Sequence, residues 1–325
     1  MDITVTDQIR GAAIFMIILS HYITRVFTPG TSHYYWIFKD TGGIGVGAFL
    51  LVSGYGLMSS YLQKGFQKLY LIKRLLRIYL PYWFFIILWI ILDIYLLNIH
   101  HTAKEILAGF AGIVVLGDYI KEINPSLWFI TLIIFYYILF FIVFSLKISQ
   151  IKQVILLILG SSITILMSRY LGLKYGYAAL DQWGDYSLYF PVGVLLALNY
   201  KSLQKLYTLI SKDNTKFIYL LLFIIAFLLG QYYPFILTFI IIIPFLFLSS
   251  INLFSRFLLF IGTISYELYL VHIPFLLKYD FILYRQPYFV SFFIYLGIMI
   301  LLAWAAERIF STYLLKKTYT WLNIK

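Results

Sequence analysis

Residues 7–22 read DQIRGAAIFMIILSHY and combine a long apolar run with two ionisable side chains. Arg10 opens the run, and His21 follows eleven residues later. At about 3.6 residues per turn this separation is close to three turns, so both side chains project from one helix face, about 16 Å apart along the axis. Residues 9–27 are apolar enough to lie in lipid, where ionisable groups are costly and rare. We interpret this segment as one wall of a site that crosses the membrane.

The composition is that of an integral membrane protein. The 325 residues are 62% hydrophobic and 12% charged, and the mean hydropathy is +0.91. Because a soluble domain keeps about a quarter of its residues charged, this chain has too little polar surface to fold in water. The absence of cysteine excludes disulfides, thiolate metal sites and a cysteine acyl-enzyme. The net charge of +12 fits basic cytoplasmic loops, so we expect the bilayer as a partner and not nucleic acid.

Apolar stretches of near-spanning length run along the whole chain. The first is expected to remain as a transmembrane helix, because the chain opens with Asp2 and Asp7 and no small-residue cleavage site follows. Together the stretches predict spans near residues 9–27, 45–62, 79–97, 127–146, 153–169, 186–200, 216–231, 234–250, 257–277 and 288–307.

Basic segments orient these predicted spans. Residues 62–77, residues 200–216 and the C-terminal tail are rich in lysine and arginine, so the positive-inside rule places all three in the cytoplasm. The first two can share a side only if an even number of spans separates them. This holds if the short segment 103–117 is a re-entrant or interfacial piece on the outer side. The sequence therefore predicts an all-α integral membrane bundle of about ten transmembrane helices, with both termini cytoplasmic and residues 1–325 in one domain.

A glycine-rich stretch, GGIGVG at residues 42–47, leads into the second span. A dinucleotide-binding loop would need a strand–turn–helix context, which a membrane helix does not provide. The four-residue spacing of Gly43 and Gly47 favours close helix packing instead. Ser53 and Gly54 form a small polar pair in mid-span, which leaves two interpretations open: helix packing, or passage for a long thin ligand.

Arg74 and Arg77 lie three residues apart, so they share a helix face just before the third span. Membrane topology alone accounts for basic residues at this place. Two arginines on one face are also suited to a phosphorylated ligand, because a guanidinium group can contact phosphate oxygens in a bidentate manner.

The stretch GTISYELYLVH at residues 262–272 places polar groups inside a late span. Ser265, Tyr269 and His272 are spaced by four and three residues and therefore share a face. Glu267 lies near mid-span and needs a partner, for which Arg10 is one candidate. The alternative to a functional site is a structural polar seam between helices.

Two aromatic residues near these motifs can also have a purely structural role. Tyr266 can belong to such a seam, and Trp128, at the outer mouth of a span, can be an aromatic-belt residue. His33, His100 and His101 fall in or near outer loops and form no spaced ligand set, so we expect no metal site.

Together these motifs resemble the acyltransferase-3 family of bacterial membrane proteins. Its members characteristically carry Arg-x10-His in the first helix, Ser-Gly-x-x-Leu in the second, Arg-x-x-Arg before the third and a late Ser-Tyr-x-x-Tyr-Leu-x-His. The matching positions here are Arg10 to His21, Ser53 to Leu57, Arg74 to Arg77 and Ser265 to His272, and Leu127-Trp128 matches a further Leu-Trp pair. The family's usual ten-span architecture agrees with the parity argument, and no appended soluble domain is expected.

The resemblance implies transfer of an acyl group, usually acetyl, from cytoplasmic acyl-CoA to a hydroxyl of a surface polysaccharide at the bacterial plasma membrane. It implies that Arg74 and Arg77 hold the anionic end of coenzyme A, with Arg10 farther along the path. The pantetheine arm would pass Ser53 and Gly54.

The same resemblance implies a catalytic role for several residues. His21 would be the general base, and Tyr269, Tyr266 or an arginine would stabilise the oxyanion. The acceptor would arrive near Trp128 and His272, and Glu267 would complete the catalytic set. Whether His21 itself carries the acyl group is left open.

Two other classes of protein also place charges and histidines inside a bundle. One is a transporter of glycans or lipid-linked sugars, against which the chain shows no visible inverted repeat. The other is a non-catalytic subunit of a glycan export complex. The partners expected for an acyltransferase are acyl-CoA, a surface glycan or lipid-linked saccharide, and either glycan-biosynthesis proteins or a second copy of the chain.

Overall fold

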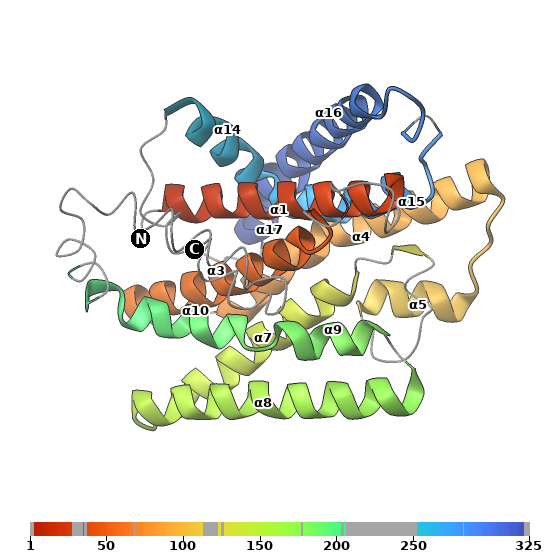
Figure 1. Ribbon diagram of the computed structural model, residues 1–325. Coiled ribbons are helices and arrows are strands. Elements are labelled where there is room, and N and C mark those ends of the chain that lie inside the picture. Colours follow the sequence, from red (N-terminus) through yellow and green to blue (C-terminus); the bar gives the residue numbers. More distant parts are fainter. Residues whose placement is uncertain are drawn as a thin grey trace. The chain divides into compact units, whose positions relative to one another are not determined.

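The described part of the chain is helical throughout (Figure 1). The computed structural model describes residues 3–27, 35, 38–67, 69–112, 123–124, 127–176, 178–202, 205, 252–281 and 283–321. In chain order the helices are α1 (Ile3–Val26), α3 (Thr41–Lys64), α4 (Tyr70–Leu97), α5 (Ala103–Ala111), α7 (Leu127–Ser145), α8 (Gln150–Tyr175), α9 (Ala178–Tyr186), α10 (Tyr189–Leu198), α14 (Asn252–Thr263), α15 (Ser265–Leu277), α16 (Tyr288–Ala306), the π-helix η1 (Glu307–Leu314) and α17 (Leu315–Trp321).

Six helical segments among the described residues are long and apolar enough to cross a membrane. They are Val5–Val26, Thr41–Lys64, Tyr70–Leu97, Leu127–Ser145, Gln150–Tyr175 and Tyr288–Thr320. Each coincides with a span predicted from the sequence, which confirms the prediction of an all-helical membrane protein.

Two predicted spans take a different form in the structure. Within residues 186–200 the described helix α10 has ten residues, which at about 1.5 Å per residue covers roughly half of a 30 Å hydrocarbon core. Residues 257–277 are divided between α14 and α15, which meet at a bend of 76°, as in a broken span or a re-entrant loop. The described residues therefore contain six spans, or seven if the bent pair is one, and the predicted spans 216–231 and 234–250 lie outside those residues.

The chain divides into two compact units, and each is described by itself. Unit 1 comprises Met1–Gly65 and Tyr189–Ser265, and unit 2 comprises Phe66–Leu188 and Tyr266–Lys325.

Glycines bring the helices of unit 1 into backbone contact. A Cβ on Gly262 of α14 would collide with the Asp7 carbonyl of α1, and one on Gly11 of α1 would collide with the Leu258 carbonyl of α14. Gly47 of α3 lies against the ring of Tyr189 on α10, and Gly45 of α3 lies against the Ala13 carbonyl of α1. Two glycines of the stretch 42–47 therefore lie in close helix contacts.

In unit 2 the short helix α5 returns along α4. A capping box formed by Thr102 and Glu105 starts α5 just after the end of α4. Three side chains of α4 then donate hydrogen bonds to carbonyls at the end of α5: Tyr79 to Ala111 at 3.0 Å, Trp83 to Phe110 at 2.9 Å, and Tyr82 to Gly109. Residues 103–112 therefore double back beside α4, which is the arrangement that a re-entrant segment requires. The remainder of the predicted segment 103–117 lies outside the described residues.

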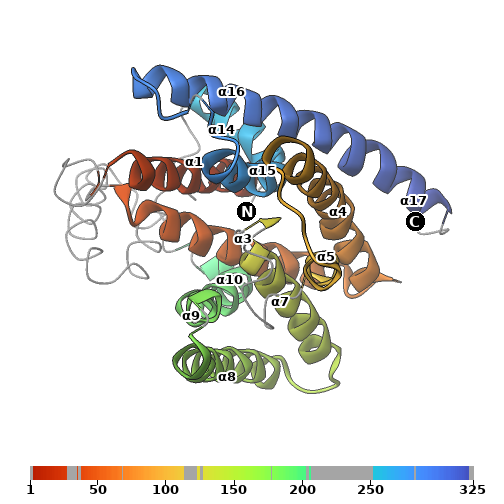
Figure 2. The same cartoon turned by 90° about the vertical axis from the view of Figure 1, so that its right-hand side faces the viewer.

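Helices α16, η1 and α17 follow one another as one long helical segment (Figure 2), whose last turns reach the start of α4. Tyr319 of α17 donates a hydrogen bond of 3.1 Å to the carbonyl of Lys73. The opposite end of the same helix lies near the end of α15, since Tyr295 donates to the Tyr279 carbonyl at 2.9 Å. Within unit 2, the basic start of α4 and the basic tail therefore share one end, as the positive-inside argument requires.

Candidate functional site

Arg10 and His21 lie on one uninterrupted helix, α1, as the sequence predicts. Arg10 Nη1 donates to Asp7 Oδ1 at 2.7 Å, so the carboxylate paired with this guanidinium lies one turn earlier on the same helix. The His21 side chain is exposed, whereas its neighbours Ser20 and Tyr22 are buried.

Hydrogen bonds fix the chain around His21 within unit 1. Ser20 Oγ donates to the Lys39 carbonyl at 2.8 Å, and Thr41 Oγ1 donates to the Met16 carbonyl at 3.3 Å. These contacts tie the entrance of α3 to the half of α1 that carries His21.

Ser53 and Gly54 lie on α3 and have different environments. Ser53 is half-buried, whereas Gly54 is buried and covered by the backbone carbonyl of Phe190 on α10. Gly193 of α10 is covered in turn by the Leu51 carbonyl of α3. Of the two interpretations left open for Gly54, the structure therefore favours helix packing, because Phe190 occupies the space that a ligand would need.

In unit 2 the structure brings the Trp128 region and the late motif together. Asn124 Nδ2 donates to the Leu270 carbonyl of α15 at 3.0 Å, and the rings of Phe129 and Tyr269 lie 5.1 Å apart between centroids. Trp128, the neighbour of Phe129, stacks on Tyr186 of α9 at 5.6 Å. The start of α7 thus lies beside the face of α15 that carries Tyr269.

Polar groups on α15 are held in defined orientations. His272 is fully buried, and its Nδ1 donates to the Tyr269 carbonyl at 2.7 Å. Because a carbonyl can only accept, this contact places a proton on Nδ1. Glu267 is also buried, in the first turn of the helix, where the helix dipole favours a negative charge.

Tyr266, one turn before Tyr269 on α15, contacts α4 near the two arginines. Tyr266 donates a hydrogen bond of 2.9 Å to the Ile78 carbonyl, next to Arg77. Arg74 is half-buried and Arg77 is exposed, and the Arg74 guanidinium lies 5.6 Å from the centre of the Tyr70 ring. Tyr266 therefore connects α15 to the helix that carries the two arginines.

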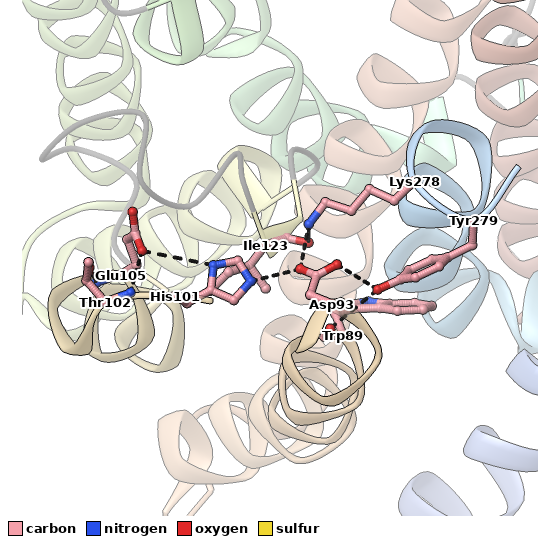
Figure 3. Close-up of polar contacts among 8 residues, drawn as sticks. All are labelled: Trp89, Asp93, His101, Thr102, Glu105, Ile123, Lys278 and Tyr279. Atoms are coloured by element: carbon pink, nitrogen blue, oxygen red, sulfur yellow. Dashed lines mark hydrogen bonds and ion pairs between the residues drawn. The ribbon is translucent and has the colours of Figure 1, made fainter. Parts of the chain in front are cut away.

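A buried charged network in unit 2 was not predicted from the sequence (Figure 3). Asp93, whose side chain is 0% exposed, accepts from Lys278 Nζ at 2.7 Å, from Tyr279 Oη at 2.7 Å and from His101 Nε2 at 2.8 Å. The opposite ring nitrogen of His101 faces Glu105 Oε2 at 4.0 Å. Burial, together with the adjacent Asp93 carboxylate, raises the pKa of the Tyr279 phenol, so this group stays protonated and donates.

One signal in the sequence could have revealed this network. Asp93 is the one acidic residue in the apolar run 79–97, and an ionisable residue inside a span marks a site by default. Lys278 instead looks like an ordinary cation at the end of a span. Among the described residues, no group of three histidine, aspartate or glutamate side chains is arranged to hold a metal ion.

Comparison with known proteins gives one match. A family described as an acyltransferase domain matches residues 5–308, which includes most of both units and every candidate residue named above. Searches of curated proteins and of solved structures found no match.

Proposed function

The chain belongs to the acyltransferase-3 family and is therefore an acyl-transfer enzyme, and we propose that it transfers an acyl group, acetyl in the simplest case, from acyl-CoA to a hydroxyl of a surface glycan. The observation that carries this proposal is that Arg10 and His21 lie on one continuous helix, α1, within the residues that the acyltransferase domain family matches. The proposed setting is a bacterial plasma membrane, with the donor on the cytoplasmic side and the acceptor on the outer side.

The donor is proposed to bind at the basic start of α4. Arg74 and Arg77 are three residues apart on this helix, and a guanidinium group can donate two parallel hydrogen bonds to a phosphate. Arg10 and Ser53 would contact the pantetheine arm along its path toward His21. We assign Gly54 no contact with the donor, because Phe190 covers it.

In the chemical step we assign the role of general base to His21. Its imidazole takes the proton of the acceptor hydroxyl while the hydroxyl oxygen attacks the thioester carbonyl. The new carbon–oxygen bond forms, the carbon–sulfur bond breaks, and the leaving thiolate takes the proton from the imidazolium. A phenol from Tyr269 or Tyr266, or an arginine, would stabilise the negative charge on the carbonyl oxygen.

The acceptor is proposed to bind between the start of α7 and α15. Trp128 offers an aromatic face for a sugar ring, and His272 and Glu267 are fixed polar groups on the neighbouring helix. A lipid-linked saccharide would satisfy the same contacts as a surface polysaccharide.

The test uses purified protein in liposomes with labelled acetyl-CoA and a glycan acceptor. We expect release of free CoA only when the acceptor is present, and we expect His21→Ala to lose this release. His100 is an exposed histidine after α4, so His100→Ala serves as the control and should keep the activity. His21→Ala should still bind acetyl-CoA, because its imidazole acts on the acceptor. Full turnover by His21→Ala would overturn the assignment of the base. Movement of glycan without consumption of acetyl-CoA would indicate a transporter instead.

A further inference from the structure

The C-terminal helix α17 contacts the basic start of α4 through Tyr319. The Tyr319 hydroxyl donates to the Lys73 carbonyl at 3.1 Å, and Lys73 Nζ lies 5.9 Å from the centre of the Tyr319 ring. The guanidinium groups of Arg77 and Arg74 also act on the Tyr319 phenol electrostatically. A residue near the end of the chain is thus packed among three cations from one stretch of α4.

Three cations of this region form no ion pair with a carboxylate in the part of the chain that the structure describes. Among the described residues, no carboxylate forms an ion pair with Arg74, Arg77 or Lys316, the exposed lysine in the first turn of α17. Like charges held close together repel, so such a cluster costs free energy unless an anion neutralises it.

The geometry of α17 directs one of its two lysines toward the cluster. Leu315 is buried, and Tyr319 follows four residues later, so these two side chains mark the face that packs on the protein. At about 100° per residue, Lys316 lies about 60° from Tyr319 around the helix, whereas Lys317 lies on the opposite side.

The cluster lies beyond the hydrocarbon region. The helical segment Tyr288–Thr320 has 33 residues, or roughly 50 Å at about 1.5 Å per residue, against a core of about 30 Å. The predicted span 288–307 ends nine residues before Lys316, so the last turns of this segment, which carry Lys316 and Tyr319, are expected to project past the membrane core at the end where α4 begins.

We propose that Lys316 and Tyr319 of α17 join Lys73, Arg74 and Arg77 of α4 in a binding site for the phosphate groups of coenzyme A. This inference rests on the proposed function, and it extends the donor site to a helix outside the family match, which ends at residue 308. Lys316 contacts a phosphate directly, and Tyr319 is a positioning residue that holds the Lys73 turn. Phosphate oxygens are strong acceptors for ammonium and guanidinium donors.

The experiment measures binding of acetyl-CoA and of 3′-dephospho-acetyl-CoA to the full-length protein in nanodiscs of neutral phosphatidylcholine. Lys316→Gln should weaken acetyl-CoA binding about three- to fivefold, as expected for one exposed charge contact, and less in high salt. Lys317→Gln, with the same change of charge on the opposite face, should stay within about twofold. If Lys316 contacts the 3′-phosphate, Lys316→Gln will not weaken binding of 3′-dephospho-acetyl-CoA. If Lys316 contacts the diphosphate, Lys316→Gln will weaken binding of both ligands.

Tyr319→Phe keeps the ring and removes the hydroxyl. In the transfer assay it should raise KM for acetyl-CoA and leave kcat unchanged, whereas a general loss of structure would lower kcat as well. Equal effects of Lys316→Gln and Lys317→Gln would overturn the inference.

Anionic lipid headgroups carry the same phosphate chemistry and could compete for these cations. If these cations bind lipid headgroups instead, Lys316→Gln and Tyr319→Phe will bind acetyl-CoA as tightly as the wild type in neutral nanodiscs. The two variants will then differ from the wild type only in how much anionic lipid co-purifies with them. That result would contradict the inference. If the wild-type protein itself binds no acetyl-CoA, both the proposed function and this inference are wrong. Binding by the wild type with no difference among the variants refutes only the role of α17.

Discussion

At the residue scale, Asp93 is a fully buried carboxylate with three hydrogen-bond donors. One fully buried carboxylate accepts hydrogen bonds from a lysine, a tyrosine and a histidine, contributed by the end of α15 and by the corner after α4. The lysine is itself only 15% exposed. Such a pair adds little net stability when both partners are present, but removal of one partner leaves a charge buried without compensation. The network therefore fixes the end of α15 against α4, and with it the helix that carries Tyr269 and His272.

We expect Asp93→Ala to destabilise the protein by about 3 kcal/mol, because it leaves the Lys278 ammonium buried without its counter-ion. Tyr279→Phe removes one hydrogen bond to a charged group and should cost about 1.5 kcal/mol. The double variant Asp93→Ala with Lys278→Met should be more stable than the sum of the single effects predicts. Unfolding of detergent-purified protein measures each variant, and strict additivity would show that the two charges do not interact.

At the element scale, glycines determine how closely the helices of unit 1 pack. Gly54 and Gly193 let α3 and α10 meet backbone to backbone, and Gly11 and Gly262 do the same for α1 and α14. Without a hydrophobic driving force between helices in lipid, close van der Waals contact of this kind supplies much of the association.

Two glycines on the same helix provide a matched test. Gly54→Ala would insert a methyl group into the Phe190 backbone and should destabilise the protein by about 1–3 kcal/mol. Gly56→Ala meets nothing within 4 Å and should be neutral or stabilising by up to about 1 kcal/mol, because alanine is the better helix former. The melting temperatures of the two variants, measured in the same detergent, test this prediction. Equal melting temperatures for Gly54→Ala and Gly56→Ala would mean that α3 and α10 do not pack as described.

At the scale of the whole molecule, the question is which side of the membrane each segment occupies. In unit 2 the basic start of α4 and the basic tail lie together, while Asp93 and Lys278 bring the far ends of α4 and α15 together. This agrees with cytoplasmic placement of residues 62–77 and of the tail.

Because the chain has no cysteine, single introduced thiols report topology cleanly. In intact cells, a membrane-impermeant maleimide should label Tyr119→Cys, whereas Lys64→Cys and Lys317→Cys should react only after permeabilisation. This pattern follows if segment 103–117 does not cross the bilayer. Labelling of Tyr119→Cys only after permeabilisation would place residues 118–124 in the cytoplasm and overturn the ten-span arrangement.

Patterns in the amino-acid sequence were enough to predict a helical membrane protein of the acyltransferase-3 family, with Arg10 and His21 on one continuous helix. Both predictions use local information: hydropathy states which solvent each segment requires, and residue spacing states which side chains share a face. Tertiary contacts were needed to show that residues 257–277 bend between α14 and α15, that Phe190 covers Gly54, and that Asp93 binds a lysine 185 residues away in the chain. These features depend on which segments pack against each other in the folded protein. The residue pattern of one segment does not specify which other segment it will contact.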